Sequence, residues 1–138
     1  MRRAIKITRS VAYAGRPRHT LDICRPVHAV AAPVVVFFYG GGWRHGNKRL
    51  YRYVAKALAR RGCVAVVPDY RVYPEARYPD FIEDAALAVR WLKDNAARFG
   101  GDPEKIFLQG HSAGAHIAAM LAIDGRQADL VQPAAINR

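Results

Sequence analysis

The sequence is short of cysteine and of long apolar runs. Its two cysteines, Cys24 and Cys63, stand far apart without metal-ligand spacing, so we expect thiols of a reducing compartment rather than a disulfide. No stretch approaches the roughly 18 apolar residues of a membrane span. Met1–Thr20 also lacks the apolar core of a signal peptide. These absences predict a cytoplasmic chain with no membrane span and no metal site.

Acidic residues are scarce as well. The chain has 22 Lys and Arg against 11 Asp and Glu, a formal net charge of +11. Nucleic-acid binding would need a basic face interleaved with aromatic side chains. The densest basic cluster instead lies in a segment expected to form an amphipathic surface helix, on the side facing solvent. Its members are Lys48, Arg49, Arg52, Lys56, Arg60 and Arg61. We therefore expect no nucleic-acid partner.

The most informative segment that is present is Gly110-His111-Ser112-Ala113-Gly114. It follows the apolar run 106–109 and precedes a helix expected over Ala113–Ile123. Strand, G-x-S-x-G and helix together make a nucleophile elbow, a sharp turn that exposes the serine oxygen. Glycines two residues on either side of the serine avoid a collision across this turn, and the helix N-terminus directs N–H groups toward it.

A second glycine cluster, Gly40-Gly41-Gly42 followed by Trp43, also comes directly after an apolar run, 34–38. Glycines after a strand let backbone N–H groups turn toward a ligand. Acyl transfer needs such donors because negative charge develops on the carbonyl oxygen. A nucleotide-binding loop is the alternative, but the pattern G-x-x-x-x-G-K-[ST] is missing. Paired with the elbow, the cluster predicts an oxyanion hole.

These motifs resemble the esterase/lipase group of the α/β-hydrolase fold. That group includes hormone-sensitive-lipase-like esterases, BD-FAE domains, isoprenylcysteine methylesterases and kynurenine formamidases. The matching segments, in family order, are 40–43, 69–75 (DYRVYPE), 99–103 (FGGDP) and 110–116 (GHSAGAH). Tyr39 stands where the group usually has the histidine that braces the loop. The resemblance implies a carboxylesterase acting on small esters without a cofactor.

Hydrophobic patterning predicts five strands. Ile5–Tyr13 and Thr20–Arg25 are expected to open the sheet as an antiparallel pair. Pro33–Tyr39, Cys63–Pro68 and Ile106–Gly110 are continuous apolar runs, which favours buried parallel strands. Alternation with helices indicates a mainly parallel α/β sheet flanked by helices. The resemblance implies that this sheet belongs to a truncated, three-layer α/β-hydrolase.

Three helices are expected between or after these strands. Lys48–Arg61 should end at Gly62, with Leu50, Val54, Ala57 and Leu58 on its inner face. Asp80–Phe99 begins with a capping-box-like pair, Asp80 and Glu83, and Gly100-Gly101 should stop it. Its inner face should consist of Ile82, Ala85, Val89, Leu92 and Ala96. The third helix, Ala113–Ile123, is apolar nearly all round and should be buried.

The chemistry then assigns roles. Ser112 is the expected nucleophile, and the N–H groups of Gly41, Gly42 and Ala113 the expected oxyanion hole. Trp43 is expected to line the substrate site, although plain packing explains it equally well. Asp69 and Arg71 are expected to brace a loop rather than to react.

The catalytic base and acid are harder to find. In this fold they follow the serine as Asp or Glu and then His. After Ser112 the only histidine is His116, which lies one helical turn along and not over the serine oxygen. His45 is another weak candidate. We therefore expect residues 1–138 to be the N-terminal part of a single domain of roughly 250 residues or more, without acid or base. A catalytically dead remnant or a non-catalytic binding module remains the alternative to an enzyme.

The resemblance also implies a strand order of one-two-four-three-five, followed by three more strands. Within these 138 residues the fifth strand would then have an open edge. Ile106–Gly110 carries no charge, proline or bulge to protect that edge, so we expect self-association through it.

Overall fold

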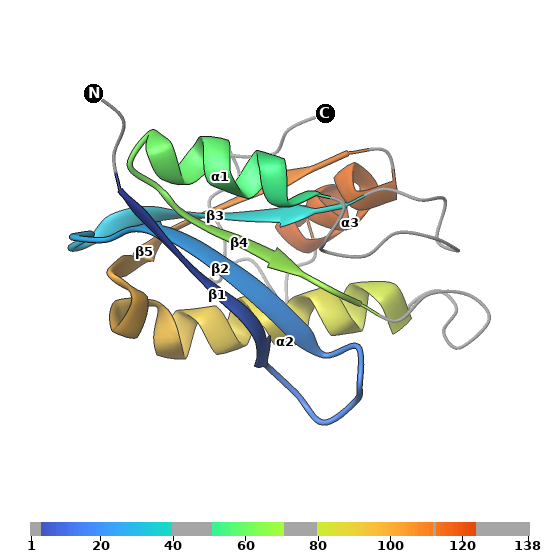
Figure 1. Cartoon of the computed structure of the whole chain (residues 1–138). Coiled ribbons are helices and arrows are strands. Elements are labelled where there is room, and N and C mark those ends of the chain that lie inside the picture. Colours follow the sequence, from blue (N-terminus) through green and yellow to red (C-terminus); the bar gives the residue numbers. More distant parts are fainter. Residues whose placement is uncertain (1–3, 40–50, 71–79, 112, 124–138) are drawn as a thin grey trace.

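A computed structural model describes residues 4–39, 51–70, 80–111 and 113–123. Its elements, in chain order, are β1 (Ile5–Ala12), β2 (Thr20–Pro26), β3 (Ala32–Phe38), α1 (Arg52–Arg60), β4 (Val64–Pro68), α2 (Asp80–Asn95), the 3-10 helix η2 (Ala96–Phe99), β5 (Gly101–Gly110) and α3 (Ala113–Ile123). The strands form one sheet in the order β1-β2-β4-β3-β5 (Figure 1). The predicted strand order is confirmed.

The sheet is antiparallel at one end and parallel at the other. β1 pairs antiparallel with β2, and β2 antiparallel with β4. β3 pairs parallel with both β4 and β5. The predicted opening pair and the three parallel strands are therefore confirmed. β5 begins five residues earlier than expected, because Gly101 already pairs with Ala32 before the register shifts.

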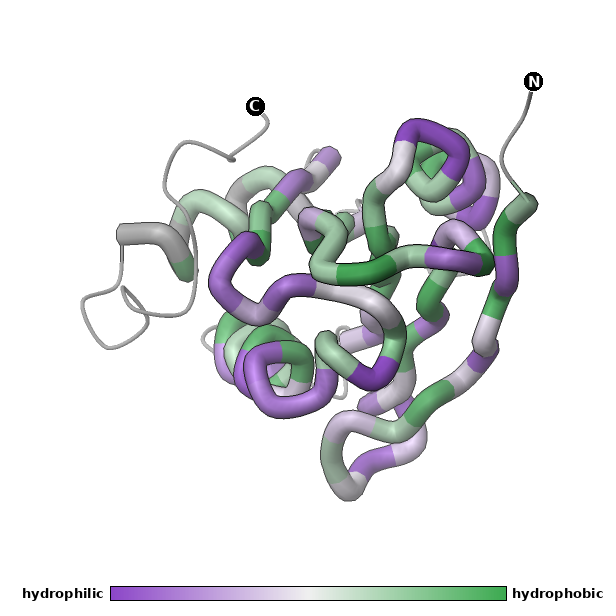
Figure 2. The backbone as a smooth tube through the Cα atoms, turned by 90° about the vertical axis from the view of Figure 1, so that its left-hand side faces the viewer, coloured by the Kyte–Doolittle hydropathy of each residue, from purple (hydrophilic) through white to green (hydrophobic). Residues whose placement is uncertain are grey.

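Helices cover both faces of the sheet. α1 lies against one face, over β2 and β4, while α2 lies on the opposite face (Figure 1). α3 contacts α2 and packs on β3 and β5. Figure 2 shows α1 and α2 with hydrophilic and hydrophobic positions alternating around their axes, as expected of helices that lie on a sheet. The structure therefore has the three layers that the sequence predicts.

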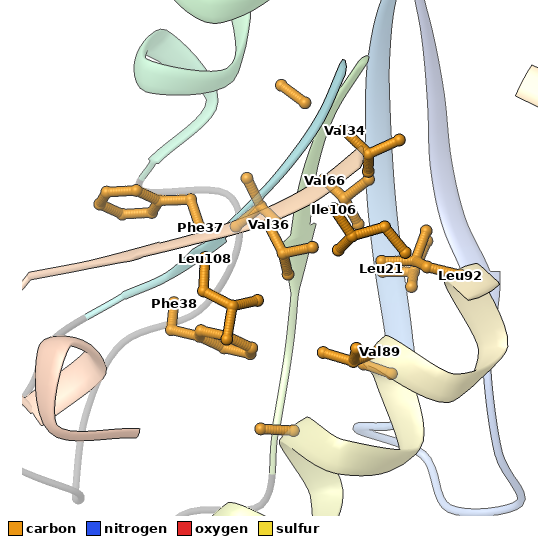
Figure 3. Close-up of a cluster of buried hydrophobic side chains, with 14 of the residues drawn as sticks. Leu21, Val34, Val36, Phe37, Phe38, Val66, Val89, Leu92, Ile106 and Leu108 are labelled. Carbon is orange, nitrogen blue, oxygen red and sulfur yellow. The ribbon is translucent and has the colours of Figure 1, made fainter. Parts of the chain in front are cut away.

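The core lies mainly between the sheet and α2. Val34 and Val36 of β3 and Ile106 and Leu108 of β5 face this helix and are at most 1% exposed (Figure 3). Phe37 points to the other face, where its ring lies 5.4 Å from that of Tyr51. Continuous apolar runs predicted burial on both faces of the parallel strands, and the structure bears this out.

One face of α1 differs from the prediction. Ala55 and Ala59 are the buried residues, whereas Ala57 is exposed. Their small side chains let the helix lie close to the sheet, which turns its inner face away from position 57. The predicted end at Gly62 is confirmed, since Gly62 has φ +100° and its N–H donates to Ala59 O. The Cys63 N–H donates to Leu58 O, and the two bonds make a Schellman motif. Lys48–Leu50 fall outside the residues described.

The inner face of α2 is as predicted: Ile82, Ala85, Val89, Leu92 and Ala96 are all buried. The α-helical part ends at Asn95 and continues as η2. Gly100 then adopts φ +79°, and a Cβ there would overlap the backbone carbonyl group of Ala29. Glycine is required at this position, so the predicted stop is confirmed.

Candidate active site

The carboxyl ends of β3, β4 and β5 meet at one edge of the sheet, where α/β folds place their ligand sites. Tyr39 follows β3, Asp69 and Tyr70 follow β4, and His111 follows β5. Of the predicted site residues, Gly41, Gly42, Trp43 and His45 lie outside the described residues, as does Ser112. Their roles stay predictions, and the site is built here from the residues that flank them.

The strand–helix junction around Ser112 is tied to the end of β3. The His111 N–H donates to the Phe38 carbonyl, with N···O 3.1 Å. The Gly114 N–H donates back to the His111 carbonyl at 3.0 Å, which joins the end of β5 to the first turn of α3. The His111 side chain is exposed. The residues on either side of Ser112 are thereby held in a tight turn, as the elbow motif predicts.

The two glycines of the motif are there because backbones touch. A Cβ at Gly110 would overlap the backbone of Gly114 and Ala115. A Cβ at Gly114 would overlap the carbonyl groups of Phe38 and Tyr39. The prediction that side chains would collide at these two positions is confirmed. It follows that the elbow and the end of β3, which leads into Gly40–Gly42, are in direct contact.

α3 begins at Ala113, as predicted. His116 lies one turn into this helix, but its side chain is not among those described, so its exclusion as a base stays a prediction. Ile117, Ala118 and Leu121 are at most 1% exposed, in agreement with the burial expected of an apolar helix.

Tyr39 is the centre of a buried hydrogen-bond network. Its hydroxyl donates to Asp69 Oδ1 at 2.9 Å. It accepts from Arg18 Nη2 at 2.8 Å and from the Tyr70 N–H at 3.3 Å. The Tyr39 side chain is 0% exposed. These contacts connect the end of β3 to the end of β4 and to the connection between β1 and β2.

Tyr70 completes the network from the other side. Its hydroxyl donates to the Tyr39 carbonyl at 2.9 Å, and the two rings stack at 4.7 Å between centroids. Burial raises the pKa of Tyr39 far above its ordinary value; the Asp69 carboxylate raises it further and the Arg18 guanidinium opposes the shift. Burial raises the pKa of Tyr70 too. Both phenols therefore remain protonated donors through neutral pH.

Asp69 has the bracing role that the sequence predicted. Besides accepting from Tyr39, it lies 3.8 Å from Arg18 Nη2, and its backbone carbonyl accepts from the Tyr13 hydroxyl at 2.6 Å. Arg71, its predicted companion, lies outside the described residues. Sequence reasoning missed Arg18 and Tyr13. Both belong to no motif, and only the strand order brings them to Asp69.

A second buried pair was also missed. His19 Nε2 lies 2.8 Å from Asp84 Oδ1, and the two residues are 4% and 0% exposed. The Arg16 N–H donates to His19 Nδ1, so Nε2 carries the hydrogen that Asp84 accepts. The pair resembles the acid and base of a triad. His19, however, directly precedes β2, and three strand spacings, about 14 Å, separate β2 from β5. The pair fastens the β1–β2 connection to α2.

Two expected absences can be examined over the part of the chain that the structure covers. In that part, no helix is long and apolar enough to cross a membrane. Nor do three or more histidine, cysteine, aspartate or glutamate residues gather there as a metal site would require. Cys24 and Cys63 are both thiols, the first buried and the second partly buried.

Comparisons with known proteins agree with the family resemblance of the sequence. The BD-FAE family profile matches residues 21–136. The chain is 42% identical over 115 residues to a probable isoprenylcysteine alpha-carbonyl methylesterase, ICMEL1, of Oryza sativa, covering 83% of this chain and 27% of that protein. It is 45% identical over 98 residues to the carboxylesterase NlhH of Mycobacterium tuberculosis, covering 70% and 31%.

Among solved structures, the Pyrobaculum calidifontis esterase superposes with a TM-score of 0.79 at 34% identity, covering 89% of this chain and 40% of that one. The chain thus spans less than half the length of this structure and about a third or less of the two curated relatives. Because the family profile covers nearly all of the chain and the sheet order agrees, the chain belongs to the BD-FAE family of α/β-hydrolase carboxylesterases.

Proposed function

We propose that this chain carries the nucleophile and oxyanion half of a serine carboxylesterase site for small acyl esters. The observation that carries the proposal is the contact between Gly114 and the carbonyl groups of Phe38 and Tyr39. It brings the segment that contains Ser112 against the segment that leads to Gly41 and Gly42. An attacking oxygen and the donors for an oxyanion must lie about 3 Å from the same carbonyl group, so this proximity is what acyl transfer needs.

In the proposed reaction, Ser112 Oγ attacks the ester carbonyl and a tetrahedral intermediate forms. The N–H groups of Gly41, Gly42 and Ala113 stabilise its oxyanion, and the N-terminus of α3 adds a favourable dipole. The serine hydroxyl gives up its proton, and the alcohol leaves protonated in its place. Water then hydrolyses the acyl-serine to the carboxylic acid and the free serine hydroxyl. Trp43 is proposed to line the acyl or leaving-group side. Losing one oxyanion donor typically costs about 3–4 kcal/mol of barrier, so these backbone groups carry much of the chemistry.

The proposal assigns no acid or base within residues 1–138, which it treats as part of one α/β-hydrolase domain. No histidine follows His116 in this sequence. His19 with Asp84 is not assigned this role, because His19 borders β2, three strands away from β5. His116 and His45 remain the only weak candidates for a base. We therefore expect residues 1–138 alone to acylate slowly and to turn over negligibly.

The competing function is a binding module that holds an ester without reacting with it. The lack of a histidine after His116 favours this alternative for the chain taken alone. The two functions differ in one respect that can be tested, because only the enzyme-type site makes Ser112 react covalently.

The test uses diethyl p-nitrophenyl phosphate. Ser112 Oγ would attack phosphorus, p-nitrophenolate would leave with the bonding electrons, and the serine proton would pass to solvent. We expect the wild-type chain to gain one diethylphosphoryl group by mass spectrometry. Ser112→Ala should gain none. Ser10→Gly is the matched control, because Ser10 is the other serine of the chain and its φ of +54° suits glycine.

The outcomes separate the two functions. Labelling that Ser112→Ala abolishes and Ser10→Gly retains supports the serine site, whereas no labelling supports the binding module. Hydrolysis of p-nitrophenyl acetate at several turnovers per second, abolished by Ser112→Ala, would contradict the expected absence of a base. His116 and His45 would then have to be tested by substitution.

A small ester is the proposed substrate and nucleic acid is not a proposed partner. Arg52, one of the basic residues of α1, is already paired internally through Nε with Asp22 Oδ2 at 3.3 Å. Two thiols are compatible with the reducing cytoplasm that we infer.

A further inference from the structure

We propose that Arg18 and Tyr39 are positioning residues that fix the direction in which the chain leaves β3 and so place the oxyanion donors of the proposed site. The inference rests on the proposed function and adds to it Arg18, which lies outside every motif of the family resemblance. We call Arg18, Tyr39, Asp69 and Tyr70 the tyrosine clamp.

The Tyr39 hydroxyl uses its full hydrogen-bonding capacity within the clamp. A phenol has one donor hydrogen and can accept two further bonds. The hydrogen goes to Asp69 Oδ1, and the acceptor positions are taken by Arg18 Nη2 and the Tyr70 N–H. Because the ring is fully buried, no water substitutes for a lost partner. The hydroxyl therefore has one arrangement that satisfies all its neighbours.

The clamp also holds the backbone of Tyr39. The Tyr70 hydroxyl donates to the Tyr39 carbonyl, while the Tyr39 hydroxyl accepts from the Tyr70 N–H, so each side chain is bonded to the other residue's backbone. A peptide unit is planar, so a fixed Tyr39 carbonyl also fixes the plane of the peptide bond that follows. Gly114 packs against this same carbonyl from the elbow. The Tyr39 carbonyl is thereby a shared contact of the elbow and of the segment that leads to the proposed oxyanion donors.

Arg18 is the part of the clamp that comes from outside the site. Its Nε donates to the Tyr70 carbonyl at 2.8 Å and its Nη2 to the Tyr39 hydroxyl at 2.8 Å. The planar guanidinium fork thus spans the exits of β4 and β3 with fixed geometry. It also brings a positive charge to within 3.8 Å of buried Asp69. A neutral residue at position 18 would hold the segments that follow β3 and β4 less firmly. It would also remove this positive charge from the surroundings of the Asp69 carboxylate.

The test measures phosphorylation of Ser112 by diethyl p-nitrophenyl phosphate at several reagent concentrations, in the full chain and in Arg18→Met and Tyr39→Phe. We expect the maximal inactivation rate to fall about tenfold to a hundredfold, the usual effect of a reacting geometry displaced by about 1 Å. The reagent concentration giving half-maximal rate should stay the same. The measurements are made at a temperature where circular dichroism shows each variant to be folded. If the clamp served folding alone, the folded variants would keep the maximal inactivation rate of the wild-type chain.

The matched control is Arg16→Met. Arg16 lies in the same connection and loses the same charge, but its side chain is exposed. It should react like the wild-type chain. A second readout does not need activity: in protein labelled with [15N]glycine, amide exchange at Gly40–Gly42 should quicken in both clamp variants and not in the control. If Tyr39→Phe fails to fold, the test relies on Arg18→Met, because Arg18 is only half-buried.

The outcomes distinguish the two proposals. A wild-type chain no more reactive than Ser112→Ala overturns the proposed function, and the clamp loses its role with it. A reactive wild-type chain matched in rate and amide exchange by Arg18→Met overturns the clamp and leaves the proposed function standing. Slowed variants with a normal Arg16→Met support both.

Discussion

The two sides of the candidate site are held in opposite ways. On the elbow side, Gly110 and Gly114 allow backbones to touch, and the atoms nearest to an added Cβ belong to the backbone. On the clamp side, Tyr39, Asp69 and Arg18 fix the backbone through buried side-chain hydrogen bonds. Both sides meet at the carbonyl of Tyr39. A glycine contact is therefore lost when a single atom is added, whereas a hydrogen-bond network weakens one bond at a time.

The largest effect is expected where backbones touch. Gly114→Ala places a Cβ on the carbonyl groups of Phe38 and Tyr39, which cannot move without shifting β3. We expect a loss of about 3 kcal/mol or more in the free energy of unfolding, at the upper end of overpacking costs. Urea denaturation followed by circular dichroism measures it.

The control for this substitution is Gly15→Ala, since a Cβ at Gly15 meets nothing within 4 Å. Its free energy of unfolding should match that of the wild-type chain within about 0.5 kcal/mol. Equal midpoints for the Gly114→Ala and Gly15→Ala variants would mean that the elbow does not press on β3. They would contradict the difference between the two sides of the site.

A smaller loss is expected on the clamp side. Tyr39→Phe keeps the ring and its stacking on Tyr70 but removes the hydrogen bonds that the hydroxyl makes with Arg18 Nη2, Asp69 Oδ1 and the Tyr70 N–H. Losing hydrogen bonds to buried polar groups costs about 1–3 kcal/mol. We expect about 2 kcal/mol, because half-buried Arg18 can turn to water. The same denaturation experiment measures this loss.

Tyr53→Phe serves as its control, because Tyr53 is 70% exposed. No change is expected there. A Tyr39→Phe variant as stable as Tyr53→Phe would show that the network is redundant and that the stacked rings alone hold the two strand exits.

At alkaline pH the two buried tyrosines of the clamp should contribute less to the free energy of unfolding. Burial raises the pKa of Tyr39 and of Tyr70 above the ordinary 10.0. Above pH 10 the unfolded chain loses protons from these phenols that the folded chain retains, so stability is fully present below pH 10 and falls as the pH rises further. The slope is about 1.4 kcal/mol per pH unit for each buried phenol.

Unfolding free energies at pH 9, 10 and 11 check this expectation. Lysines and other groups titrate in the same range, so the informative quantity is the difference between the wild-type chain and Tyr39→Phe. That difference should shrink as the pH rises from 10 to 11. A constant difference would mean that Tyr39 ionises in the folded chain as readily as in the unfolded one.

The two sides of the site also differ in how well sequence could predict them. Gly110 and Gly114 lie four residues apart and act on their immediate surroundings, so a local motif is sufficient to predict the contact. The clamp joins residues 18, 39 and 69, which are brought together only by the order β2-β4-β3. Asp69 could be predicted from its place after a strand, but the side chain it braces could not. The error at Ala57 has a similar cause, since helical periodicity fixes which residues share a face but not how closely small side chains let that face approach the sheet.

The same contrast extends to the strands that carry the two sides. The clamp follows β3 and β4, which are interior strands, whereas the elbow follows β5, the last strand of the sheet within the described residues. The two halves of β5 differ in how well their side chains protect the edge of the sheet. Its first half contains Pro103, Glu104 and Lys105, which protect an edge. Ile106–Gly110 has no such protection, so the predicted self-association should proceed through this second half.

The expected effect is the smallest of the series because it changes association and leaves the fold of each copy intact. Sedimentation velocity should show a concentration-dependent oligomer at tens of micromolar, the range in which exposed edges associate. Phe107→Lys should abolish it, because Phe107 is half-buried on β5 and a charge there protects the edge. Leu87→Lys on α2 is the control, since Leu87 is 42% exposed and lies on a different element. A wild-type chain that stays monomeric throughout, or an oligomer that only Leu87→Lys disrupts, would remove β5 as the contact and leave the elbow strand as well protected as those of the clamp.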